Sequence, residues 1–164
     1  MDEKTFWQII DAAKTTAGQN YQARPSALEV QLRPLDLQSL ASFQKRYEGY
    51  LLHANRWSLW GAAYLMNGGC SDDGFKYFRD WLISEGRDVY ESALVNPEYL
   101  TIFPRREYYE LEQFGYAASE VFAQKGGGEL ERDFAVEISA PEGKEWKESE
   151  LPVMFPKLAA KFIH

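Results

Sequence analysis

The amino-acid sequence predicts a mainly α-helical protein, built as a single compact domain of several helices. Apolar residues recur at spacings of three and four over most of the first 125 residues, which is the helical period. Glycine, asparagine and proline interrupt this pattern and mark the ends of helices. Hydrophobic residues make up 45% of the chain and charged residues 26%, a balance typical of globular proteins and too apolar for disorder.

The first predicted helix begins after Asp2 and stops at Gly18. Acidic residues suit the positive end of a helix, and glycine is common at its exit. Five apolar side chains form one stripe along it: Phe6, Ile9, Ile10, Ala13 and Ala17. Residues 19–25 are predicted to form a loop, and residues 26–33 a short helix.

Asp36 is a good N-cap for the second long helix, which is predicted to run to about Asn55. Its inward stripe consists of Leu37, Leu40, Phe43, Tyr47, Tyr50, Leu51 and Ala54. Residues 58–66 continue as a helix that is apolar nearly all round, which places it inside the domain. The Asn67-Gly68-Gly69 sequence ends that helix, because glycine readily adopts the left-handed conformation that a helix exit requires.

Ser71 or Asp72 caps the next predicted helix, which runs to about Glu85. Large apolar side chains share its inner face: Phe75, Tyr77, Phe78, Trp81 and Leu82. Its other face is polar: Asp72, Lys76, Arg79 and Asp80. A further helix is predicted over 87–95, and residues 97–106 form a connector after the turn-favouring Asn96-Pro97 dipeptide.

Residues 108–125 are predicted to form the last long helix, which a run of three glycines ends. Residues 1–125 are thus expected to form a helical core, and residues 126–164 a less regular C-terminal segment of the same domain. The alternation of apolar and polar residues over 134–138 indicates one short β-strand or hairpin in that segment. A short terminal helix is predicted over 157–163.

Composition and charge disfavour several classes of function. The net charge is −7 and the isoelectric point is near 4.9, so a phosphate backbone would be repelled and nucleic acid is not an expected partner. No window approaches the run of about eighteen apolar residues that a membrane span needs, and the N-terminus lacks the pattern of a signal peptide. Cys70 is the only cysteine, which excludes an intrachain disulfide. We therefore expect a cytoplasmic protein with no membrane association and no cofactor.

The Gly68–Gly74 segment contains the residues on which a hypothesis of enzymatic activity would rest. A thiol just ahead of a helix N-terminus lies in a field that favours the thiolate, so Cys70 is the candidate nucleophile of a small enzyme. His53, on the preceding helix, is the candidate base, and Asp73 completes the set. The alternative is that Cys70 packs as a small hydrophobe, because the neighbouring carboxylates oppose thiolate formation.

Asp72 and Asp73 are also the candidates for a metal site. The alternating acids, central glycine and distal glutamate of a calcium loop are missing, and two carboxylates at a helix start usually act as caps. No metal is therefore predicted, and Asp72 and Asp73 are weak candidates only. The patterns of a phosphate loop and of a nucleophilic serine elbow are also missing.

Aromatic and charged side chains gather on the two helices that flank the glycine turn. Trp, Arg and neighbouring polar groups are the residue types enriched at binding hot spots, while the plainer interpretation is an aromatic core. The candidate binding residues are Asn67, Asp72, Asp73, Arg79, Asp80, Trp57, Trp60 and Trp81.

The stretch WSLWGAAYLMNGGCSDDGFKYFRDWLISEGR, residues 57–87, resembles the signature of the bacterial family catalogued as domain of unknown function 4240. The segments FWQIIDAA and YELEQFGYAASEVFAQK are also similar to that family's pattern. The resemblance implies no catalytic or ligand-binding residues.

The hypothesis that the sequence favours is a non-catalytic, acidic cytosolic binding module of the regulatory or toxin-neutralising type. It would recognise a protein partner or a small ligand through residues 67–81. One alternative is a small enzyme centred on Cys70 or on the Asp72/Asp73 carboxylates. Another is a structural or assembly protein.

Overall fold

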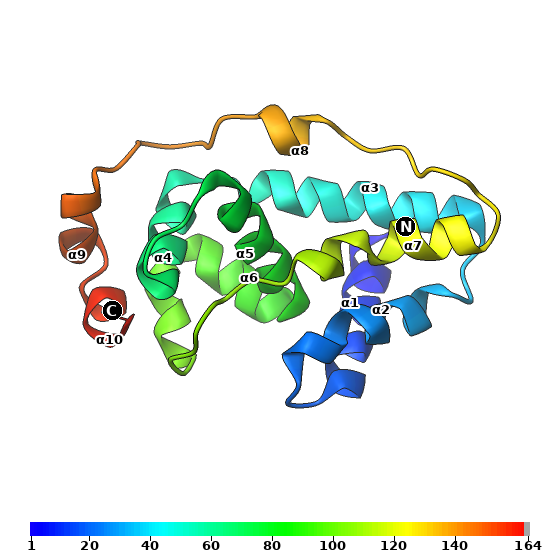
Figure 1. Ribbon diagram of the computed structural model, residues 1–164, viewed down its shortest axis with the longest axis horizontal. Helices are drawn as coiled ribbons and strands as arrows, with labels where there is room; N and C mark the ends of the chain where they lie inside the picture. Colours follow the sequence, from blue (N-terminus) through cyan, green and yellow to red (C-terminus); the bar gives the residue numbers. More distant parts are fainter. Residues whose placement is uncertain (163–164) are drawn as a thin grey trace.

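The computed structural model describes residues 1–162, and these residues form helices joined by short turns and by one long C-terminal strap (Figure 1). Side-chain caps begin three of the helices, and two of these caps, at Asp36 and at Ser71 or Asp72, are predicted from the sequence. Asp2 accepts a hydrogen bond from the Thr5 amide at 2.7 Å, and Asp36 accepts one from the Ser39 amide at 2.7 Å. The Ser71 hydroxyl, rather than Asp72, accepts from the Gly74 amide at 3.1 Å.

The first half of the chain contains α1 (Glu3–Ala17), α2 (Arg24–Leu32), α3 (Leu37–His53), α4 (Trp57–Asn67), α5 (Asp72–Ser84) and α6 (Arg87–Val95). Gly68 ends α4 with φ +65°, in the left-handed region that a side chain disfavours. The predicted loop over 19–25 is wrong in its second half. Residues Tyr21–Ala23 form the short 3-10 helix η1, and α2 begins at Arg24 because Pro25 suits the first turn of a helix.

The second half contains η2 (Pro97–Ile102), η3 (Glu112–Tyr116), α7 (Ala117–Gln124), α8 (Ala135–Ile138), η4 (Glu148–Glu150), α9 (Leu151–Met154) and α10 (Pro156–Phe162). The predicted terminal helix is confirmed up to Phe162, and its last predicted residue, Ile163, lies outside the described residues.

The long helix predicted over 108–125 is wrong in its first half, because the backbone there bonds to other helices. The Asn67 side chain accepts from the Tyr109 amide at 2.7 Å and donates to the Tyr109 carbonyl at 3.3 Å. The Leu111 amide donates to the Tyr77 carbonyl at 3.0 Å. These groups are therefore not free to form helical bonds, and α7 begins only at Ala117.

The predicted strand over 134–138 is also wrong, because this segment forms the helical turn α8. The Asp133 side chain accepts from the Ala135 amide at 2.9 Å, which starts the turn as an N-cap would. Within residues 1–162, no second strand lies beside it, and the one β-type contact there is an isolated bridge between Arg56 and Glu142. An unpaired strand would leave its backbone groups unsatisfied. The prediction of a mainly α-helical protein is confirmed.

Aromatic rings fill much of the interior between α1, α3 and α6. Phe6 stacks on Phe43 with ring centroids 4.9 Å apart, and Trp7 meets Tyr50 at 4.8 Å and Tyr90 at 5.4 Å. Offset and edge-to-face ring pairs stabilise a core beyond their buried area. None of the helices within 1–162 is both long and apolar enough to span a membrane.

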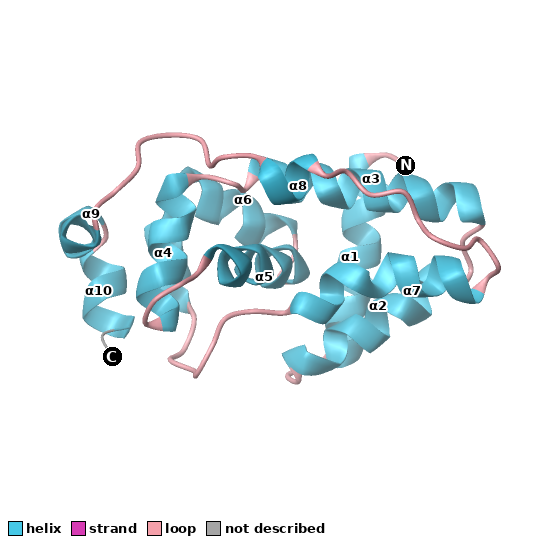
Figure 2. Cartoon of the chain, turned by 45° about the horizontal axis from the view of Figure 1, so that its top comes forward, coloured by secondary structure: helices cyan, strands magenta, loops and turns pink. Residues whose placement is uncertain are grey.

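The chain after α7 turns back and runs the length of the molecule, past α3, to α9 and α10 beside α4 (Figures 1 and 2). We call residues 126–147 the strap. Most of its side chains are exposed, but Leu130 and Val136 are buried and attach it to the helices beneath. The α10 helix packs against α4, which fixes the far end of the strap.

Candidate functional site

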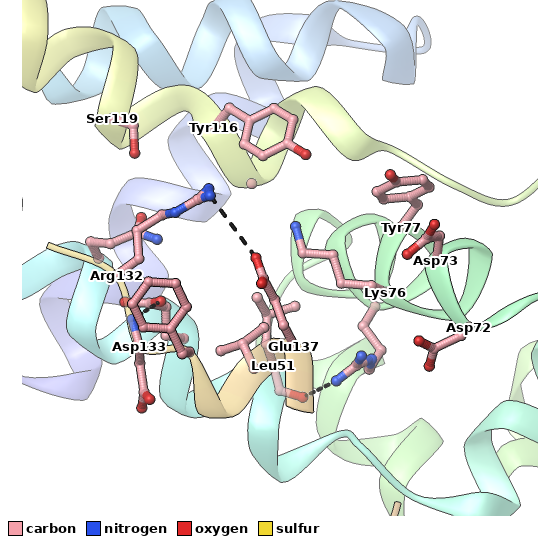
Figure 3. A pocket seen from close by; sticks show the side chains of 16 residues that line it. Leu51, Asp72, Asp73, Lys76, Tyr77, Tyr116, Ser119, Arg132, Asp133 and Glu137 are labelled. Atoms are coloured by element: carbon pink, nitrogen blue, oxygen red, sulfur yellow. Dashed lines mark hydrogen bonds and ion pairs between the residues drawn. The ribbon is translucent and has the colours of Figure 1, made fainter. Parts of the chain in front are cut away.

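A polar cavity of about 260 Å³ lies between α3, α5, the start of α7 and the strap (Figure 3). We call it the central cavity. Figure 3 shows that Lys76 from α5 and Glu137 from the strap extend toward each other in the cavity, with Tyr116 and Ser119 on another side of it. Arg79 and Leu51 also line it. The central cavity thus combines charged groups with apolar side chains, as small-molecule sites do.

Arg79 is the most unusual group in the central cavity, because its guanidinium is almost fully buried yet has no carboxylate partner. The residue is 3% exposed. Nη1 donates to the Leu51 carbonyl at 2.7 Å, and Nε donates to the Phe75 carbonyl at 3.4 Å. Within residues 1–162, Arg79 makes no ion pair within 4.0 Å, and Nη2 has no acceptor. Burial lowers the pKa of Arg79 to about 10, although the charges of Asp80 and Asp72 act in the opposite direction, so the guanidinium stays charged at neutral pH.

A stack of aromatic rings lies against Arg79. The rings of Trp57 and Trp60 lie 5.1 Å apart and those of Trp60 and Phe75 lie 5.2 Å apart, each pair within 6° of parallel. The Arg79 guanidinium carbon lies 4.5 Å from the centroid of the Phe75 ring. A cation over a ring face is attracted by the ring quadrupole, which offsets part of the cost of burying it. The Phe75 ring, together with the carbonyls of Leu51 and Phe75, therefore positions the guanidinium.

Asp80 is fully buried behind the wall of the central cavity. Its carboxylate accepts hydrogen bonds from the Tyr47 hydroxyl at 2.6 Å and from Lys76 Nζ at 3.0 Å. Burial raises the pKa of Asp80 to about 6, although Lys76 and Tyr47 act in the opposite direction. Gly115 lies directly against this carboxylate and separates it from solvent. Asp80 and Lys76 thus form a structural ion pair at the edge of the cavity.

The strap closes one side of the central cavity through polar contacts with α3. Glu48, 8% exposed, accepts a hydrogen bond from the Asp133 amide at 2.8 Å. Burial raises the pKa of Glu48. Arg132 and Glu137 form a loose ion pair at 4.0 Å across the top of α8. The strap therefore brings its own charges to the cavity, partly paired with each other.

The charges that line the central cavity are predominantly acidic. Three cationic side chains face five anionic ones: Lys76, Arg79 and Arg132 against Glu48, Asp72, Asp73, Asp133 and Glu137. Asp72 and Asp73 are exposed in the first turn of α5, and Figure 3 shows them on the side of the cavity formed by that helix. The rim is therefore negative around a buried positive group.

The structure distributes the predicted binding residues over three settings. Asp72, Asp73 and Arg79 meet in the central cavity. Asp80, Trp81 and Asn67 are buried in bonds to the protein itself: Asn67 binds the Tyr109 backbone, and Trp81 Nε1 donates to Glu85 at 3.0 Å. Trp57 and Trp60 are half-buried and belong to the stack beneath Arg79.

Cys70 and His53 lie in different surroundings. Burial raises the pKa of the Cys70 thiol to about 12, so the thiol is protonated at neutral pH. His53 is exposed at the end of α3, where its ring contacts Arg56 Nη2 at 3.2 Å. No hydrogen bond joins Cys70 to His53 in the part of the chain that the structure describes. Residues 1–162 also contain no group of three or more His, Cys, Asp or Glu side chains that could hold a metal ion.

Sequence reasoning missed several cavity residues. Gln44 and Glu48 lie four positions apart beside the apolar stripe of α3, and this spacing signals two polar groups on one inward face. Tyr116 and the strap residues Arg132 and Glu137 carry no such signal, because their positions depend on the long-range path of the chain.

One comparison with known proteins identifies a family. The family described as "Protein of unknown function (DUF4240)" matches residues 1–124, so the chain belongs to that family and the predicted resemblance is confirmed. No curated protein and no solved structure matches the chain. The match spans α1 to α7 and ends before the strap. The central cavity is thus lined by family residues of α3, α5, η3 and α7, and by strap residues outside the match.

Proposed function

We propose that this member of the family is a non-catalytic binding module that holds a small polar ligand in the central cavity. The observation that carries the proposal is Arg79, a buried guanidinium that faces the cavity without a carboxylate partner. Burying a charge without an ion-pair partner in contact costs free energy, and the charges of Asp80 and Asp72 act on Arg79 only from beyond 4.0 Å. A ligand that supplies the missing acceptor would recover part of that cost, which makes the site suited to binding.

The chemistry of the surrounding groups supports binding rather than catalysis. The pKa of Asp80, about 6, would suit a general acid or base, but its carboxylate is sealed behind Gly115. Burial raises the pKa of Tyr116 to about 12, so its hydroxyl is a donor and not a base at neutral pH. Cys70, with its protonated thiol, does not line the cavity.

A small ligand suits this site better than a large protein surface, because the strap crosses one side of the cavity. A regulatory role agrees with such a module, since a ligand held beneath the strap would alter the exposed segment above it. A cytoplasmic location is supported by the lone, half-buried thiol of Cys70 and by the acidic composition.

The test is a thermal-shift screen of small polar compounds, followed by calorimetric titration of each compound that stabilises the protein. Ligand at one hundred times its Kd stabilises the folded state by about 2.7 kcal/mol. Ser119→Trp fills the cavity from α7 and should abolish the shift, whereas Ser26→Trp, on an exposed position of α2, should leave it unchanged. Equal binding by the folded Ser119→Trp variant, or the lack of any binding compound, would refute the proposal.

A further inference from the structure

We infer that the ligand of the central cavity is a small amino-carboxylate, a molecule with one carboxylate and one positively charged amine. This inference rests on the proposed binding function and specifies its chemistry. The carboxylate would bind Arg79 at the buried side of the cavity. The amine would lie near the acidic rim formed by the first turn of α5.

The hydrogen bonds of Arg79 indicate that the ligand carries a carboxylate. A guanidinium has five N–H donors, and in Arg79 the structure gives partners to Nε and Nη1 only, both of them backbone carbonyls. Nη2 has no acceptor among residues 1–162, and the side chain lines the cavity. A carboxylate is the anion whose planar pair of oxygens fits a guanidinium edge. The ligand can therefore supply the missing acceptor and a carboxylate in direct contact with the guanidinium, which Asp80 and Asp72 do not provide.

The other two cations of the central cavity are already paired. Lys76 Nζ lies 3.0 Å from Asp80, and Arg132 lies 4.0 Å from Glu137. Arg79 is thus the one cavity cation, among the residues described, that lacks a carboxylate within 4.0 Å. A single cationic anchor suits a singly charged carboxylate, whereas a phosphate carries more charge than the cavity would neutralise.

The excess of acidic side chains around the cavity indicates that the ligand also carries a positively charged amine. Asp72 and Asp73 form no ion pair within residues 1–162 and are exposed at the rim. Both lie on α5, the helix that also carries Arg79, and the Asp72 charge, after that of Asp80, raises the pKa of Arg79 through space. A simple anion approaching Arg79 would be repelled by these carboxylates. An amine on the same ligand converts that repulsion into attraction.

The walls between the two ends are partly apolar. Leu51 and Val136 are buried side chains that line the cavity, and Phe134 lines it from the strap. Methylene groups can pack against these side chains without leaving polar atoms unsatisfied. A ligand with a short aliphatic spacer between its charges therefore matches the cavity from end to end.

The test is calorimetric titration with the ω-amino acids from glycine to 6-aminohexanoate, beside the alkanoate and the alkylamine of each length. At least one ω-amino acid should bind tenfold more tightly than both matched probes. Arg79→Gln should weaken it at least tenfold, whereas Arg87→Gln, on an exposed position of α6, should not change it. An alkylamine that binds as tightly as the ω-amino acid would overturn the inference.

A second variant keeps the inference testable if Arg79→Gln does not fold. The double substitution Asp72→Asn, Asp73→Asn changes two exposed residues and should weaken the ω-amino acid while it strengthens the alkanoate. Equal affinity of both probes for the variant and the wild type would overturn the inference. If a neutral compound binds and Ser119→Trp blocks it while the ω-amino acids do not bind, the amino-carboxylate inference fails and the proposed function stands. If no compound binds, the proposed function itself fails.

Discussion

Gly115→Ala should destabilise the protein, because a methyl group at this position has no room. A Cβ atom built on Gly115 would lie 2.6 Å from Asp80 Oδ1 and 3.1 Å from Asp80 Cγ. The Asp80 side chain is short, fully buried and held by Tyr47 and Lys76, so it cannot move aside without losing a bond. The substitution therefore acts on the buried carboxylate at the edge of the central cavity.

The size of the effect can be worked from these contacts. Loss of one hydrogen bond to a charged group costs about 1.5–3 kcal/mol. Replacing glycine by alanine also restricts the unfolded chain, which returns about 0.4–1 kcal/mol. Gly115→Ala should thus lower the free energy of unfolding by about 0.5–2.6 kcal/mol. At about 2–4 °C per kcal/mol for a chain of this size, Tm should fall by roughly 1–10 °C.

The assay is urea unfolding followed by tryptophan fluorescence, with Gly49→Ala as the control. Gly49 lies on the exposed side of α3, with nothing within 4 Å of an added Cβ. Alanine is a better helix former than glycine, so this variant should gain about 0.5–1 kcal/mol. Equal gains at Gly49 and Gly115 would refute the close approach of Gly115 to Asp80.

Three further predictions concern buried polar groups. Burial raises the pKa of Asp80 from its ordinary 3.8 to about 6, so the folded state binds this proton more tightly than the unfolded chain does. The stabilisation that this proton gives the folded state is complete below about pH 4 and is lost as pH rises through 6. At 1.36 kcal/mol per pKa unit, the total loss is about 3 kcal/mol. The wild type should therefore lose most of this, about 2 kcal/mol of unfolding free energy, relative to Asp80→Asn between pH 4 and 7. A difference that is constant with pH would contradict this assignment. Asn67→Ala leaves the buried Tyr109 amide and carbonyl without their partner, so unfolding free energy should fall by about 2–4 kcal/mol in urea titrations, and a neutral effect would exclude these bonds. Cys70, with a pKa of about 12, should react with a disulfide reagent at pH 8 much more slowly in the folded protein than in urea, and equal rates would show an accessible thiolate.

Local signals explain which helices the sequence predicts well. The caps Asp2, Asp36 and Ser71 act within three residues, and the apolar stripes of α1, α3 and α5 are continuous. Residues 109–111 are predicted to be helical by the same local signals, and this prediction is wrong. Their apolar spacing is helical, but Asn67 and the Tyr77 carbonyl bind their backbone groups. Long-range partners of this kind are not visible in a local pattern.

The central cavity is predictable only in part for the same reason. Asp72, Asp73 and Arg79 belong to one helix, so their spacing alone groups them near one another. The strap residues Arg132 and Glu137 join them only because the chain returns along the length of the molecule, and their own sequence gives no sign of it. Trp57 and Trp60, which the sequence predicts as binding residues, lie in the aromatic stack next to Arg79.

The most direct test of a ligand in the central cavity is an NMR titration of the nitrogen-labelled protein with the tightest-binding ω-amino acid. The Arg79 Nε–H signal and the Trp60 indole signal should shift with the Kd that calorimetry gives, because Arg79 lines the cavity and both side chains pack against the Phe75 ring. The Trp7 indole donates to Tyr50 between α1 and α3, away from the residues that line the cavity, and should not move. Shifts at Trp7 without shifts at Arg79 would contradict the account.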